Sequence, residues 1–215
     1  TKHITHIKDM LLFGLAEMVE SRDSNTGGHI KRTSEVVKIF ATKLLENKDK
    51  FNLTKDFLSL VTKAAPMHDL GKIAIDDAVL RKPGKYTPEE YEEMKRHSKE
   101  GAIKIKKILE NVEDKDFVKI AINIAYYHHE KWNGKGYPTG KKETEIPIEA
   151  RIMALADVFD ALVSKRCYKD SFSYDEAFSI IKDSLGQHFD PSLGMLFLEC
   201  RSELEQFYNN TFADV

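Results

Sequence analysis

The chain has 215 residues, of which 41% are hydrophobic and 32% are charged, and its formal net charge is −2. This length predicts one domain, residues 1–215, with a sizeable core, and the balanced charge gives no indication of binding to DNA or to an anionic membrane. The two cysteines, Cys167 and Cys200, are too few for a disulfide framework or a cysteine-based zinc site, and they indicate a reducing compartment. Because the sequence shows neither a transmembrane run nor a signal peptide, we expect no membrane span and a cytoplasmic location.

Apolar residues recur at steps of three and four through most of the sequence, and strand patterns are nearly absent, which predicts an all-α helical bundle. In the N-terminal half, this pattern covers residues 7–19, 30–44 and 57–64. Residues 1–20 are also interpreted as the end of a helix from an upstream regulatory domain, and they offer a surface for a homodimer.

In the C-terminal half, two helix starts are marked by proline. Thr87, followed by proline and two glutamates, predicts a helix that opens with a capping box. Asp190, also followed by proline, predicts a helix that runs through Leu204. Between them, residues 148–162 carry another long apolar helical pattern.

Imidazole and carboxylate side chains lie inside or directly after these apolar segments. His68 and Asp69 follow the predicted helix at residues 57–64, where a buried carboxylate without a partner would be strongly destabilising. Asp157 and Asp160 lie three residues apart in an apolar helix and therefore on one face. A single histidine on a helix is more often structural than a ligand, but the histidines and carboxylates taken together predict a buried metal site.

The order of these residues resembles the HD superfamily of metal-dependent phosphohydrolases, and in particular its HD-GYP branch. The resemblance runs through most of the chain and rests on five blocks. They are Arg22-Asp23 with Thr26-Gly27, His29 and Arg32; His68-Asp69 with Gly71-Lys72; His97 with Gly101; His128-His129-Glu130 with Gly134 and Gly136-Tyr137-Pro138; and Arg151 with Asp157, Asp160, Ala161 and Leu162. A histidine–aspartate pair alone would carry little weight, but five blocks in this order do not agree by chance.

The resemblance implies a helical bundle with two divalent metal ions in its core, bridged by Asp69. One ion is expected on His29, His68, Asp69 and Asp157, and the other on Asp69, His97, His128 and His129. Two ions about 3.5–4 Å apart can share a water molecule, lower its pKa and stabilise both the attacking and the leaving oxygen of a phosphodiester. Five imidazoles and two carboxylates suit iron, manganese, cobalt, nickel or zinc better than magnesium or calcium, and the family favours iron or manganese.

The resemblance also assigns roles to basic residues. Asp69 and Lys72 are expected to be catalytic, with Lys72 contacting a phosphate oxygen or stabilising the departing 3′-oxygen; the alternative is a solvated surface lysine. Arg166 and Lys169 are expected to bind substrate phosphates, the alternative being an ordinary surface pair of basic residues.

Three further residues, Arg32, Glu130 and Asp160, are expected to orient the ligands without binding the ions. Asp160 is also the alternative ligand in place of Asp157.

Gly134, Gly136, Tyr137 and Pro138 form a loop in which glycine permits positive φ and proline then restricts the backbone. The resemblance associates this loop with substrate binding and with docking of a diguanylate cyclase (GGDEF) domain. A simple turn is the alternative.

Asn25 departs from the family pattern, because many members carry a glutamate there that helps to hold a third metal ion. A neutral amide is a poor replacement for that carboxylate, so we predict a dinuclear site. In the family, dinuclear members tend to stop at the linear dinucleotide.

We therefore expect a cyclic-di-GMP phosphodiesterase that hydrolyses one 3′–5′ phosphodiester through a metal-bridging hydroxide and releases mainly linear pGpG. Two alternatives stay open. One is a nucleotide-sensing or partner-docking module with weak or no turnover, against which the complete ligand set argues. The other is a phosphodiesterase acting on a hybrid cyclic dinucleotide.

Overall fold

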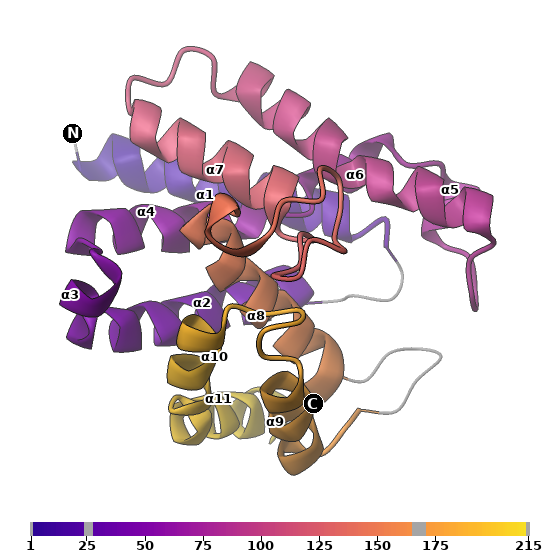
Figure 1. The fold of residues 1–215 in the computed structure, drawn as a ribbon. Coiled ribbons are helices and arrows are strands. Elements are labelled where there is room, and N and C mark those ends of the chain that lie inside the picture. Colours follow the sequence, from indigo (N-terminus) through magenta and orange to yellow (C-terminus); the bar gives the residue numbers. More distant parts are fainter. Residues whose placement is uncertain (1, 24–27, 165–170, 214–215) are drawn as a thin grey trace.

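The computed structural model describes residues 2–23, 28–164 and 171–213 (Figure 1). Within these residues every regular element is a helix, and an isolated bridge between Leu185 and Phe189 is the one strand-like pairing. The all-α fold predicted from the sequence is confirmed.

The helices of the first half precede the long loop at residues 81–87, and those of the second half follow it. In chain order they are α1 (Lys2–Glu20), α2 (His29–Glu46), α3 (Lys48–Phe51), α4 (Lys55–Ala64), the 3-10 helices η1 (Ala65–Met67) and η2 (Leu70–Ala74), α5 (Asp77–Leu80), α6 (Pro88–Ile108), α7 (Lys115–Tyr127), η3 (Glu143–Glu145), α8 (Ile148–Val163), α9 (Tyr174–Asp183), α10 (Pro191–Leu198) and α11 (Arg201–Ala213).

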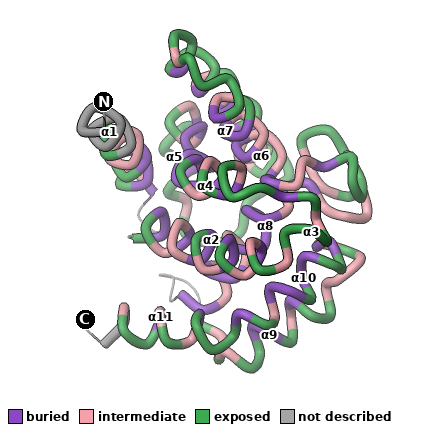
Figure 2. Tube along the Cα trace, turned by 90° about the vertical axis from the view of Figure 1, so that its left-hand side faces the viewer, coloured by how far each residue is buried: buried purple, intermediate pink, exposed green. Residues whose placement is uncertain are grey.

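Helix α8 lies at the centre of the molecule and contacts α2, α7, α9 and α10 (Figure 1). Its side chains Ile152, Met153, Leu155 and Phe159 are fully buried. A helix that packs on several sides must be apolar on several sides, which explains the long apolar pattern of this segment. Figure 2 shows the buried trace of α8 inside the bundle, with α1 at its edge.

The predicted helix starts are confirmed, but one predicted helix is shorter than expected. Thr87 caps α6 with a complete capping box, and the Asp190 side chain caps α10. The expected continuation through Leu204 is wrong, because α10 ends at Leu198 and α11 begins at Arg201. The intervening amides bond to carbonyls three residues earlier, which forms a tight turn.

The apolar helix α4 ends at Ala64, four residues before His68. Pro66 lies in the following 3-10 helix, and a proline inside an α-helix would lack an N–H group and clash with a carbonyl of the preceding turn. His68 and Asp69 therefore lie in the short bend between η1 and η2, and these two elements contact α1, α2, α4, α6 and α7.

Among the described residues, no helix combines the length and the apolar composition needed to cross a membrane.

Candidate metal centre

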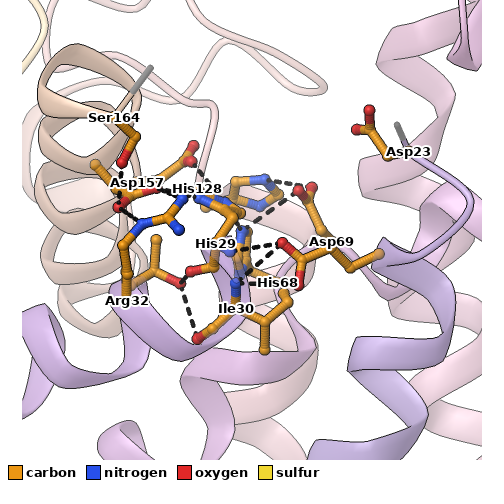
Figure 3. Close-up of polar contacts among 12 residues, drawn as sticks. Asp23, His29, Ile30, Arg32, His68, Asp69, His128, Asp157 and Ser164 are labelled. Atoms are coloured by element: carbon orange, nitrogen blue, oxygen red, sulfur yellow. Dashed lines mark hydrogen bonds and ion pairs between the residues drawn. The ribbon is translucent and has the colours of Figure 1, made fainter. Parts of the chain in front are cut away.

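Asp69 is the point at which the predicted ligands converge (Figure 3). Its Oδ2 lies 3.4 Å from Nε2 of His68, and its Oδ1 lies 3.4 Å from Nε2 of His97 and 3.8 Å from Nε2 of His128. The Asp69 side chain is only 13% exposed. One carboxylate thus faces histidines that are up to 59 residues distant in the sequence.

Two groups of side chains offer ligand atoms that all lie within 4.8 Å of one another, and Asp69 belongs to both. One group is His29, His68 and Asp69; the other is Asp69, His97, His128 and His129. Asp157 lies beside the first group, because its Oδ1 is 3.4 Å from Nε2 of His29. All seven predicted ligands therefore lie together.

Three of the histidines are held by backbone carbonyls on the side away from Asp69. A carbonyl can only accept a hydrogen bond, so each Nδ1 must donate, which leaves Nε2 as a bare acceptor in the neutral ring. The bonds run from Nδ1 of His68 to Ala65 O at 3.0 Å, from Nδ1 of His97 to Met94 O at 2.7 Å, and from Nδ1 of His128 to Ile124 O at 3.0 Å.

The arrangement of these acceptors fits divalent metal ions. Nε2 of His97 lies 3.5 Å from Nε2 of His128, and both face the carboxylate of Asp69. Lone pairs of two neutral imidazoles and a carboxylate that point at one another repel unless a cation lies among them. The nitrogen-rich set suits a transition metal better than magnesium or calcium.

The charge states of His128, His129 and Asp69 agree with this fit. Burial lowers the pKa of His128 to about 3, with a further contribution from His68, and burial also lowers the pKa of His129. Burial alone would raise the pKa of Asp69, but Lys72 and His68 hold it well below its usual value. Neutral imidazoles and ionised carboxylates are the forms that bind metals.

His29 differs from the other histidines because aspartates contact both of its ring nitrogens. Its Nδ1 donates to Oδ2 of Asp160 at 2.7 Å, on the side opposite Asp157. Desolvation would lower the pKa of His29, but the bonds to Asp157 and Asp160 raise it to about 9. Arg32 donates from Nε to Oδ1 of Asp160 at 2.7 Å, so Asp160 and Arg32 lie where they orient His29.

Lys72 is also part of the cluster. Its Nζ lies 2.8 Å from Oδ2 of Asp69 and 3.0 Å from Oδ2 of Asp23, in a side chain that is 16% exposed. Desolvation would lower the pKa of Lys72, but the two carboxylates raise it, so the group is an ammonium ion. It is therefore not a solvated surface lysine.

A pocket of about 300 Å³ opens above these side chains. Its polar lining includes His29, Asp69, Lys72, His97, His129 and Asp157, and its apolar lining includes Leu80, Tyr86, Met94, Tyr137 and Val158. A pocket lined by both charged and apolar side chains suits a ligand that carries both phosphate and an aromatic ring.

The loop that contains Gly136, Tyr137 and Pro138 reaches this pocket through Tyr137. The Tyr137 ring stacks on His129 with centroids 4.7 Å apart, and the bond between Tyr137 and Pro138 is cis. A Cβ on Gly136 would lie 2.3 Å from the backbone nitrogen of Lys131, so only glycine fits there.

Glu130 does not bond to a proposed ligand, contrary to the expected orienting role. Its Oε1 accepts from the backbone N of Thr139 at 2.6 Å, from Thr139 Oγ1 at 2.7 Å and from the backbone N of Gly140 at 3.2 Å. Its buried Oε2 has no hydrogen-bond partner in the described part of the chain. Glu130 therefore holds the loop that carries Tyr137.

Three residues with predicted roles, Asn25, Arg166 and Lys169, lie outside the described residues. Conversely, Glu20 was not identified from the sequence. Its Oε1 accepts from the backbone N of His29 at 2.7 Å and so caps α2, whose N-cap residue Gly28 has no side chain. Because Gly28 has no side chain to cap α2, the sequence itself indicates that another side chain must accept these backbone hydrogen bonds.

Comparison with known proteins agrees with this geometry. The family model described as HD domain matches residues 15–193. A cyclic di-GMP phosphodiesterase of Vibrio cholerae is 45% identical over 192 residues, which cover 89% of this chain and 39% of that protein. The cyclic di-GMP phosphodiesterase response regulator RpfG of Xanthomonas campestris is 40% identical, over 89% of this chain and 48% of that protein. The 3′3′-cGAMP-specific phosphodiesterase 2 of Vibrio cholerae is 38% identical, over 88% of this chain and 34% of that protein. The chain thus spans less than half the length of each of these relatives.

Two solved structures share the fold. A cyclic GMP-AMP-specific phosphodiesterase of Vibrio cholerae has a TM-score of 0.60 at 19% identity, over 94% of this chain and 49% of that one. An HDG"Y"P protein of Bdellovibrio bacteriovorus has a TM-score of 0.57 at 22% identity, over 83% and 51%. At these identities the likeness concerns the fold alone.

Proposed function

The chain belongs to the HD domain family and, within it, to the HD-GYP branch, and we propose that it hydrolyses a 3′–5′ phosphodiester bond of cyclic di-GMP. The observation that carries the proposal is Asp69, which is shared by two groups of metal-ligating side chains and paired with Lys72. The names of the relatives with the higher identities support this nucleotide as the substrate.

We propose that the cluster holds two divalent ions, iron or manganese, with Asp69 between them. When bound, such ions lower the pKa of a shared water molecule and neutralise charge on the phosphodiester. His29, His68 and Asp157 would hold one ion, and His97, His128 and His129 the other, consistent with the two groups that share Asp69.

Lys72 would stabilise the phosphate or the departing oxygen as a fixed positive charge. Because Asp69 and Asp23 raise its pKa, Lys72 keeps its proton and acts by electrostatic stabilisation rather than as a proton donor. Because Lys72 lines the pocket and lies 2.8 Å from Asp69, it is close to any phosphate that reaches the cluster.

Tyr137 would contribute to the apolar part of the pocket lining. Its ring fixes the plane of His129 by stacking. The apolar lining would receive a nucleobase, while Arg166 and Lys169 would bind the second phosphate.

We propose linear pGpG as the main product, because Asn25 lacks the carboxylate that a third ion would require. We also propose that residues 1–215 form a single domain of a cytoplasmic protein, that the Gly136–Pro138 loop docks a diguanylate cyclase domain, and that residues 1–20 take part in a homodimer.

The function is tested by loading metal-free protein with Mn²⁺ or Fe²⁺ without oxygen and following cyclic di-GMP and its products by chromatography. We expect pGpG from the wild type and none from Asp69→Asn. Asp116→Asn is the matched control, since Asp116 is an exposed carboxylate in the first turn of α7. Absence of turnover in the metal-loaded wild type, or equal turnover in Asp69→Asn, would contradict the proposal.

The hybrid nucleotide 3′3′-cGAMP is the second substrate to compare, because a relative at 38% identity is named for it. We expect a higher kcat/KM for cyclic di-GMP. A preference for the hybrid would keep the reaction and change the substrate.

A further inference from the structure

Asp160 accepts hydrogen bonds from side chains of two helices, α2 and α11, and from Ser164, which directly follows α8. Its Oδ2 accepts from Nδ1 of His29 at 2.7 Å, and its Oδ1 accepts from Nε of Arg32 at 2.7 Å and from Oγ of Ser164 at 3.0 Å. A fourth side chain, Tyr208, donates from Oη to the same Oδ1 at 2.6 Å. Both oxygens of the carboxylate therefore accept hydrogen bonds from side chains, and Asp160 is only 1% exposed.

Tyr208 reaches this position from the far end of the chain. It belongs to α11, which begins at Arg201, whereas the match to the HD domain model ends at residue 193. The Tyr208 side chain is fully buried, and its ring lies edge-on to Phe159 of α8 with centroids 5.7 Å apart. Helix α11 also packs against α2, the helix that begins at His29.

The tyrosine hydroxyl has a function that its ring does not supply. The ring alone fills the space between α11 and α8, as a phenylalanine would. The hydroxyl adds a short bond to a carboxylate whose other oxygen fixes the orientation of His29, and donors to such carboxylates influence metal affinity.

We propose that Tyr208 is a positioning residue of the metal centre, which acts through Asp160 on His29 and makes α11 a functional part of the site. The inference rests on the proposed role of His29 as a metal ligand. It also implies that a change in the packing of α11 alters metal binding although α11 carries no ligand.

The test uses Tyr208→Phe, which keeps the ring and removes the hydroxyl. Tyr174→Phe is the matched control, because the Tyr174 hydroxyl donates at 3.0 Å to Oδ1 of Asn209, also on α11, at the exposed surface. Mn²⁺ is titrated into each metal-free protein, and free Mn²⁺ is followed by electron paramagnetic resonance. We expect Tyr208→Phe to lower the affinity for one of the two ions about tenfold, which is the lower end of the range for substitutions of residues that contact metal ligands. Tyr174→Phe should bind as the wild type does.

A double-mutant cycle separates positioning from general loosening of the fold. If Tyr208 acts through His29, adding Tyr208→Phe to His29→Ala should change Mn²⁺ affinity little further. If Tyr208→Phe instead lowered the affinity by an indirect structural effect, the effects of the two substitutions on Mn²⁺ affinity would add in full. Thermal unfolding of each variant checks that the fold is kept, which we expect because Arg32 and Ser164 still donate to Oδ1.

Unchanged Mn²⁺ affinity in Tyr208→Phe, or full additivity in the cycle, would overturn this inference and leave the proposed function standing. Failure of the wild type to bind Mn²⁺ would instead contradict the proposed function.

Discussion

Gly71 of η2 packs directly against Gly101 of α6: a Cβ on Gly71 would lie 2.4 Å from the backbone nitrogen of Gly101 and 1.8 Å from the carbonyl oxygen of His97. This close approach of two backbones brings Asp69, two residues before Gly71, within 3.4 Å of the His97 ring. A glycine at position 71 is therefore needed for the distance between two proposed ligands, whereas a Cβ on Gly101 would come no closer than 3.2 Å to a neighbouring atom.

Gly71→Ala should destabilise the protein by about 3 kcal/mol, because the clash involves backbone atoms that cannot rotate away. Urea unfolding monitored by circular dichroism measures the change. Gly14→Ala is the matched control: Gly14 lies in α1, where a Cβ would meet nothing within 4 Å, and alanine should stabilise the helix by about 0.5–1 kcal/mol. Equal stability of Gly71→Ala and the wild type would show that the two backbones separate easily.

Replacing Lys72 with methionine should lower kcat about 100-fold with little loss of bound metal. The reason is that Lys72 supplies a positive charge beside Asp69 but no ligand atom. Turnover of cyclic di-GMP and metal content by plasma emission spectroscopy are measured on the same samples. Lys38→Met, which removes an exposed lysine paired with Glu35, should leave both values unchanged. Normal turnover in Lys72→Met would remove Lys72 from the mechanism.

Much of this site follows from the sequence, because each proposed ligand belongs to a short motif with a family spacing. The fold class follows as well, since the apolar periodicity of α2 and α8 is clear. The bond from Tyr208 to Asp160 could not be predicted, because it joins residues 48 positions apart and a tyrosine in an amphipathic helix carries no sign of its partner.

The contacts of Glu130 also differ from those expected from the sequence, for a related reason. Its position directly after His129 suggests an orienting role, yet its carboxylate turns toward Thr139. Sequence proximity to a ligand does not fix the direction of a side chain, which here is determined by the path of the following loop.

Glu130→Ala should raise KM for cyclic di-GMP while kcat falls less, because the loop that places Tyr137 over His129 loses three hydrogen bonds. Steady-state kinetics at saturating Mn²⁺ measure both constants. Thr139→Val removes one of the three bonds and should give a smaller effect in the same direction. If kcat alone fell in Glu130→Ala, Glu130 would be acting on the metal ligands instead.

Cys200 should not react with thiol reagents while the protein is folded. Its side chain is 2% exposed, and burial raises its pKa to about 12, with a further contribution from Glu203. At pH 8 only about one molecule in 10⁴ would carry the reactive thiolate, because that fraction falls tenfold for each pH unit below the pKa. Reaction with 5,5′-dithiobis(2-nitrobenzoic acid) is followed in Cys167→Ser, so that Cys200 is the one remaining thiol. We expect no colour from the folded protein at pH 8 and one equivalent in 6 M guanidinium chloride, where the ordinary pKa of about 8.5 returns. Rapid labelling of the folded variant would show that the turn between α10 and α11, in which Cys200 lies, opens readily.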